Sequence, residues 1–96
     1  MLDLDEPYEF DWDQGNTVKN LVKHNVSCQE SEEVFFDENQ LILDDNSHSS
    51  IEKRKLIIGK TNDNVLLSVV FTIRSNKIRV ISARRASKKE GNLYEK

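Results

Sequence analysis

The chain has 96 residues, a single cysteine and a formal net charge of −3. A chain of this length forms one small domain, 1–96, and its 28 Leu, Ile, Val and Phe residues suffice for one hydrophobic core. One cysteine excludes an intramolecular disulfide, and with two histidines it cannot form a closed four-ligand zinc site, so we expect no metal or other cofactor. No apolar run reaches the roughly 18 residues of a membrane span, and the acidic start is unlike a signal peptide. We therefore expect a soluble, cytoplasmic protein.

The charge is divided unevenly along the chain. Residues 1–48 contain 13 acidic and two basic side chains, whereas residues 49–96 contain four acidic and 12 basic ones. This asymmetry has two explanations: either the halves neutralise each other, or the basic half binds a polyanion while the acidic half faces elsewhere. The sequence leaves both open.

The first part of the chain predicts a short strand and a helix. After a polar, flexible arm at 1–9, the alternation of aromatic and acidic residues at 10–13 predicts a very short N-terminal strand with both aromatic rings on one face. Asp13 can cap a helix over 14–24, because its carboxylate accepts the free N–H groups of the first turn. Asn25 suits the end of this helix, since asparagine tolerates a left-handed backbone.

A second helix follows and completes a helical hairpin. Ser27 and Glu30 have the spacing of a capping box, in which each side chain binds the backbone N–H of the other residue. The helix is expected to run to about Phe36. Its expected inner face consists of Cys28, Ser31, Val34 and Phe35.

From residue 40 the period of the sequence changes from that of a helix to that of a strand. The expected strands are 40–43, 53–58, 65–74 and 77–83. The expected loops are 44–50 and 61–64. Gly59 is expected to end the second strand, and a second capping box, Ser87 with Glu90, predicts a helix over Ser87–Lys96. The fold class is therefore α+β, with a helical pair, an antiparallel sheet of about four strands and a C-terminal helix.

The last two strands place several cations on one face of the sheet. Around a two-residue turn at Ser75–Asn76, opposed residues of the two strands project from the same face. One face then has the apolar side chains Phe71, Ile73, Ile78 and Val80. The other face has Thr72, Arg74, Lys77 and Arg79. Three cations at this spacing repel one another unless carboxylates or a bound anion offset their charge.

The sequence resembles the BrnT family, the ribonuclease half of bacterial type II toxin–antitoxin pairs. The resemblance covers about 10–95, and its most specific part is 78–86, Ile-Arg-Val-Ile-Ser-Ala-Arg-Arg-Ala. Further matching residues are Phe10-Asp-Trp-Asp13, Asn20, Lys23-His24, Val26-Ser27, Val34-Phe35, His48-Ser49, Ile58-Gly59, Glu90 and Tyr94. The resemblance implies a RelE-like fold, RNA cleavage that inhibits translation, and a BrnA-like antitoxin whose ribbon-helix-helix domain binds operator DNA. It also implies two toxins on an antitoxin dimer, with DNA contacted only through the antitoxin.

The resemblance further suggests which residues act on RNA. Cleavage without a metal uses the 2′-hydroxyl as nucleophile and needs a base, an acid and cations near the phosphate. The candidates for these catalytic roles are Lys23, His48, Arg74, Arg79 and Arg84, with Glu52 as a further candidate base. The candidates for binding RNA are Lys77, Arg85 and Tyr94. We expect three arginines and a lysine to converge on one solvent-open pocket. Arginine suits such a pocket because it binds phosphate through two parallel hydrogen bonds.

Each of these assignments has a structural alternative. The arginines can form ion pairs with the acidic half of the chain, or can lie on a solvated sheet face. Lys23 can stabilise a helix C-terminus, His48 lies in a polar loop, and Tyr94 can pack its helix onto the sheet.

Two departures from the family bear on activity. Asn16 stands where the family usually has a lysine, and Cys28 stands where it usually has a phenylalanine. They leave open a second function, a catalytically weak or inactive homologue that binds the antitoxin or RNA. A direct DNA-binding regulator is disfavoured, because the chain lacks a helix-turn-helix pattern and its clustered cations lie largely on strands.

Overall fold

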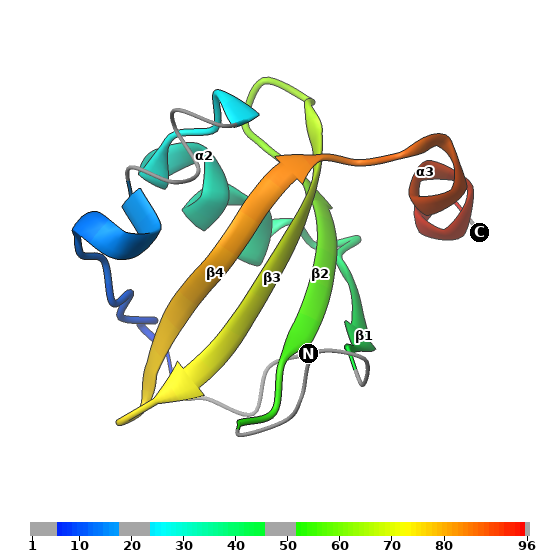
Figure 1. Cartoon of the computed structure of the whole chain (residues 1–96). Helices are drawn as coiled ribbons and strands as arrows, with labels where there is room; N and C mark the ends of the chain where they lie inside the picture. Colours follow the sequence, from blue (N-terminus) through cyan, green and yellow to red (C-terminus); the bar gives the residue numbers. More distant parts are fainter. Residues whose placement is uncertain (1–5, 18–23, 46–51, 96) are drawn as a thin grey trace.

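A computed structural model describes residues 6–17, 24–45 and 52–95 of the chain. Four antiparallel strands form one sheet in the order β1-β2-β3-β4 (Figure 1). Their bounds are Leu41–Asp44 for β1, Lys55–Lys60 for β2, Leu66–Arg74 for β3 and Lys77–Arg85 for β4. Helix α2, Cys28–Glu33, leads into the 3₁₀ helix η1, Val34–Phe36, and helix α3, Lys88–Tyr94, follows the sheet. The architecture confirms the predicted α+β class. No helix of the described residues is long and apolar enough to span a membrane.

Local capping determines where two of the helices begin. Ser27 Oγ accepts the backbone N–H of Glu30 at 3.1 Å, and Glu30 Oε1 accepts the backbone N–H of Ser27 at 3.0 Å. The same reciprocal pair between Ser87 and Glu90 begins α3. Both predicted capping boxes are confirmed. Each can be predicted from the sequence because its two residues lie three positions apart and satisfy free N–H groups of the same first turn.

The helix predicted over 14–24 is described only at its ends, where residues 14–17 and 24 are helical. Asn25 has a φ of 55°, the left-handed conformation expected at the end of this helix. The chain then enters α2, whose continuation into η1 ends at Phe36, the predicted boundary.

The predicted strand at 10–13 is reduced to one bridge. Phe10 pairs in parallel with Ile78 at the outer edge of β4. The N–H of Asp11 donates to Ile78 O at 2.8 Å, and the N–H of Ile78 donates to Glu9 O at 2.8 Å. Pairing stops there because the chain turns into the helix start directly afterwards. The C-terminal end of the predicted arm, at Glu9, is therefore hydrogen-bonded to the edge strand of the sheet.

Gly59 does not end the second strand but lies inside β2, where it is buried. A Cβ atom at this position would lie 2.9 Å from Val34 O and 3.1 Å from Val34 Cβ. The glycine is thus explained by the close approach of η1, a contact between segments that are distant in sequence. Strand β4 also differs from its prediction at its C-terminal end, because it continues to Arg85 instead of stopping at Ala83.

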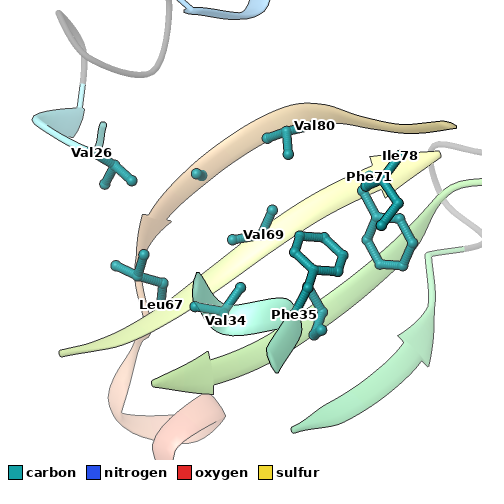
Figure 2. Packing of buried hydrophobic residues seen from close by; sticks show 10 residues of the cluster. Val26, Val34, Phe35, Leu67, Val69, Phe71, Ile78 and Val80 are labelled. Atoms are coloured by element: carbon teal, nitrogen blue, oxygen red, sulfur yellow. The ribbon is translucent and has the colours of Figure 1, made fainter. Parts of the chain in front are cut away.

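The core lies between the α2–η1 segment and one face of the sheet (Figure 2). The rings of Phe35 and Phe71 meet edge to face with centroids 5.0 Å apart, and Phe10 lies 5.5 Å from Phe35. Trp12 and Tyr8 are partly buried against this cluster. Phe10 and Trp12 thus both pack against the core cluster, in line with the prediction that their rings share one face.

The hairpin of β3 and β4 has the predicted register. The pairs nearest the turn are Arg74 with Lys77, Ile73 with Ile78, Thr72 with Arg79 and Phe71 with Val80. Ser75 and Asn76 both have positive φ, 50° and 63°, which matches the twist of a two-residue hairpin turn. Ile73 is 39% exposed instead of buried, because it lies next to the end of the hairpin. A bulge after Val70 then shifts the pairing by one residue.

Candidate functional site

A pocket of about 250 Å³ lies near the hairpin end of β4, beside the first helical turn. Its lining residues are Gly15, Asn16, Arg74, Arg79, Val80 and Ile81. Arg74 and Arg79 reach it together because the hairpin register places them on the same face of the sheet. The pocket therefore brings together two of the predicted catalytic residues.

Arg79 is the more enclosed of these two arginines, with a side chain only 14% exposed. Its Nη2 donates to Asp13 Oδ1 at 3.1 Å, and its Nη1 lies 3.1 Å from Asp13 Oδ2. Nη1 also lies 3.5 Å from Asp11 Oδ2. The hydrogen bond from Arg79 lowers the pKa of Asp13 below its ordinary value, so this carboxyl is ionised at neutral pH. Two carboxylates thus converge on one guanidinium.

The carboxylate of Asp13 is itself held by the start of the helix. Oδ1 accepts the backbone N–H of Gly15 at 2.8 Å and that of Asn16 at 3.3 Å, which confirms the predicted cap. The amide of Asn16 is 3% exposed, and its Nδ2 donates to Asp11 O at 3.0 Å and Val80 O at 2.9 Å. Its Oδ1 accepts the backbone N–H of Asp13 at 2.8 Å. Asn16 therefore joins the acidic segment, the helix start and β4 into one unit.

Arg74 forms a second, more exposed pair. Its Nε donates to Glu52 Oε2 at 2.9 Å and its Nη2 to Glu52 Oε1 at 2.6 Å, with the Arg74 side chain 49% exposed. The hydrogen bond from Arg74 lowers the pKa of Glu52, so Arg74, like Arg79, has an ionised carboxylate as its partner. Thr72, which lies opposite Arg79 in the hairpin, donates from Oγ1 to Lys53 O at 2.7 Å. Lys77 is exposed beside the turn.

Arg84 does not join this pocket. It lies five residues further along β4, about 16 Å at the rise of a strand, and lines a separate groove with Leu43, Leu56 and Val70. Its Nη1 and Nη2 donate to the two carboxylate oxygens of Glu90 at 2.8 and 2.9 Å. This pairing lowers the pKa of Glu90 to about 2. The expected convergence of three arginines and a lysine on one open pocket is therefore wrong, because the register places Arg84 near the far end of the strand.

Arg85 also lies apart from the pocket. Arg85 is exposed at the end of β4, where its carbonyl accepts Arg84 Nη1 at 3.2 Å. Lys23 and His48 lie outside the described residues.

Tyr94 anchors α3 to the rest of the molecule. Its Oη donates to Asp37 Oδ2 at 2.6 Å, and Lys60 Nζ lies 5.8 Å from the centre of its ring. Burial and the hydrogen bond to Asp37 raise the pKa of Tyr94 to about 12. The same residues line a polar cleft of about 900 Å³. Tyr94 thus packs its helix down, as the structural alternative predicted, at the opposite end of β3 from Arg74.

The comparisons with known proteins decide the family. The family model for the ribonuclease toxin BrnT of a type II toxin–antitoxin system matches residues 12–90. The chain belongs to the BrnT family. The match includes both partners of the Asp13–Arg79 pair and of the Arg84–Glu90 pair. A search of curated proteins found no match. Membership of a type II toxin family implies a protein antitoxin as partner.

In this BrnT-family chain the acidic segment pairs with the basic half of the chain, which is one of the two explanations for the uneven charge. Asp11 and Asp13 neutralise a guanidinium 66 to 68 positions away, which supports mutual neutralisation of the two halves at this point. The alternation at 10–13 places the two carboxylates on the opposite face of this segment from the aromatic rings. This alternation was the one sequence signal that pointed to the ion pairs with Arg79. Among the described residues, no group of three or more His, Cys, Asp or Glu side chains is arranged to hold a metal ion.

Proposed function

We propose that this BrnT-family chain is an endoribonuclease that cleaves RNA by 2′-hydroxyl attack without a metal, with Arg74 and Arg79 at the reacting phosphate. The observation that carries the proposal is that these two arginines line one pocket in a chain of a ribonuclease toxin family. A guanidinium has five N–H donors, of which Glu52 engages two on Arg74, and Asp13 and Asp11 together engage at most three on Arg79. Donors therefore remain for phosphate oxygens, and one such contact in the transition state contributes about 2–4 kcal/mol.

The chemistry assigns separate roles around the pocket. The 2′-oxygen attacks the adjacent phosphorus, its proton passes to a base, and the bond to the 5′-oxygen breaks as that oxygen gains a proton. Glu52 is the candidate base, since its carboxylate is hydrogen-bonded to Arg74, a residue that lines the pocket. Lys23 and His48 remain proposed catalytic residues.

The remaining predicted residues would bind RNA beyond the pocket. Arg84 would hold a phosphate further along the strand, and Arg85, Lys77 and Tyr94 would contact the flanking nucleotides. The cellular role proposed is inhibition of translation in the cytoplasm by a RelE-like toxin. A BrnA-like ribbon-helix-helix antitoxin would neutralise two toxin chains on its dimer and provide the only link to DNA.

Purified, antitoxin-free protein tests this proposal directly. We expect it to cleave an RNA oligonucleotide in the presence of EDTA, and to leave the same oligonucleotide intact when its sugars are 2′-deoxy. Arg79→Ala is expected to lower the cleavage rate by about 30- to 800-fold, the equivalent of about 2–4 kcal/mol. Circular dichroism verifies that the variant is folded. Cleavage at the wild-type rate by folded Arg79→Ala would remove this arginine from the mechanism.

A second function, an inactive homologue that binds the antitoxin or RNA, is favoured by one observation. Arg74, Arg79 and Arg84 are each already paired with a carboxylate, so a phosphate must compete with an internal anion. The departures at Asn16 and Cys28 point the same way. Expression without the antitoxin separates the two functions: normal growth with soluble protein supports the binding module, and growth arrest supports the ribonuclease.

A further inference from the structure

We propose that Asp13 is a positioning residue for Arg79, holding its guanidinium so that the N–H groups not bound to carboxylate face the pocket. The inference rests on the ribonuclease function proposed above and identifies how that site is kept ready for a phosphate. Neither the helix cap expected from the sequence nor the family description assigns this role.

The first support is that the Asp13 carboxylate has a fixed position although its side chain is 56% exposed. Oδ1 accepts the backbone N–H groups of Gly15 and Asn16, which belong to the first helical turn. Oδ1 and Oδ2 then meet Nη2 and Nη1 of Arg79, both at 3.1 Å. A carboxylate held by two backbone groups presents both oxygens in one orientation, and a bidentate pair transfers that orientation to the guanidinium plane.

The second support is a closed ring of contacts. Asn16 Nδ2 donates to the carbonyl of Val80, the residue that follows Arg79 in β4. Asn16 Oδ1 accepts the N–H of Asp13. The contacts therefore run from the Arg79 side chain to Asp13, from Asp13 to Asn16, and from Asn16 back to the backbone of Val80, next to Arg79. Both ends of the ion pair are attached to the same strand, and the guanidinium cannot move without breaking one of these bonds.

The two arginines of the pocket differ in the way this role requires. The side chain of Arg79 is 14% exposed, whereas that of Arg74 is 49% exposed and its partner Glu52 is 27% exposed. Arg79 is thus the more enclosed of the two and has its partner in place before any ligand arrives, and preorganised donors give the larger stabilisation of a developing charge. Arg74 is the adaptable partner.

Kinetics of Asp13→Asn test the role. Asparagine is as good a helix cap as aspartate and has the same size, so the variant removes the charge of the pair while keeping the cap. We expect kcat to fall about 10- to 100-fold, KM to stay within about threefold and the melting temperature to change little, because a misplacement of about 1 Å can cost about 100-fold. Asp63→Asn, which removes an exposed carboxylate in the turn between β2 and β3 that lines neither the pocket of Arg79 nor the groove of Arg84, is the matched control and should keep wild-type kcat.

A second measurement does not need cleavage. Nitrogen-15 NMR of the arginine side chains should show separate Nη–H signals for Arg79 in the wild type and averaged signals in Asp13→Asn. Unchanged Arg79 signals in the variant overturn the proposal even if the wild type cleaves no RNA, a result that by itself refutes only the proposed function. An unchanged or raised kcat in Asp13→Asn also overturns it, since the carboxylate would then be inert or merely mask Arg79.

Discussion

Gly59→Ala tests the close contact between β2 and η1 on which the core packing depends. The added Cβ would lie 2.9 Å from Val34 O, 3.1 Å from Val34 Cβ and 3.4 Å from Asp37 Oδ2. Neither atom of Val34 has room to retreat, because Val34 is fully buried and its carbonyl accepts hydrogen bonds from Asp37 N at 3.3 Å and Gln40 Nε2 at 3.4 Å. The methyl group must therefore separate the 3₁₀ helix from the sheet.

The magnitude follows from two opposing effects. Overpacking of a filled core costs about 1–3 kcal/mol, and the rigid backbone neighbour at position 59 places this case near the upper end. Alanine also restricts the unfolded chain, which returns about 0.4–1 kcal/mol. We expect the free energy of unfolding to fall by about 2 kcal/mol, equivalent to a decrease of about 8–16 °C in the melting temperature of a domain of this size.

Urea denaturation followed by circular dichroism measures this change, with Gly91→Ala as the matched control. Gly91 lies in α3, where a Cβ would meet only Leu66 Cδ2 at 3.7 Å. Alanine is favoured over glycine inside a helix, so this variant should gain about 0.5–1 kcal/mol. If Gly59→Ala were as stable as the wild type while Gly91→Ala showed its gain, the proposed contact with Val34 would not limit position 59.

Three further variants test the polar contacts. Glu90→Gln should lower the free energy of unfolding by about 1–2 kcal/mol at pH 7, since the partner Arg84 is 45% exposed and partly screened. Because folding lowers the pKa of Glu90 from 4.5 to about 2, this difference should persist above pH 4.5 and vanish as the pH falls towards 2 in urea titrations; a constant difference would contradict it. Tyr94→Phe should cost about 1.5–3 kcal/mol, and only the wild type should lose this stabilisation as the pH rises from 10 to 12, because folding raises the pKa of Tyr94. Asn16→Ala should cost about 2–3 kcal/mol, since it leaves the buried carbonyl of Val80 without its side-chain donor; thermal melts equal to the wild type would show that the link is not structural.

Local signals in the sequence determined much of the fold. The two capping boxes, the left-handed Asn25 and the two-residue turn at Ser75–Asn76 all involve residues within a few positions of one another. Their energetics need no distant partner, so the sequence predicts them directly. The strict alternation of the hairpin determined in the same way that Arg74 and Arg79 share a face.

Only the tertiary structure decided which charges meet and which glycine is needed for space. Asp13 and Arg79 are 66 positions apart, and no periodicity selects that pairing among the 17 acidic and 14 basic side chains. The distance of Arg84 from the pocket and the place of Gly59 beneath Val34 likewise follow from how separate segments pack. Such contacts depend on where whole helices and strands lie in space. A charged group interacts with every charge near it, and a side chain packs against every atom near it, whichever part of the chain supplies them.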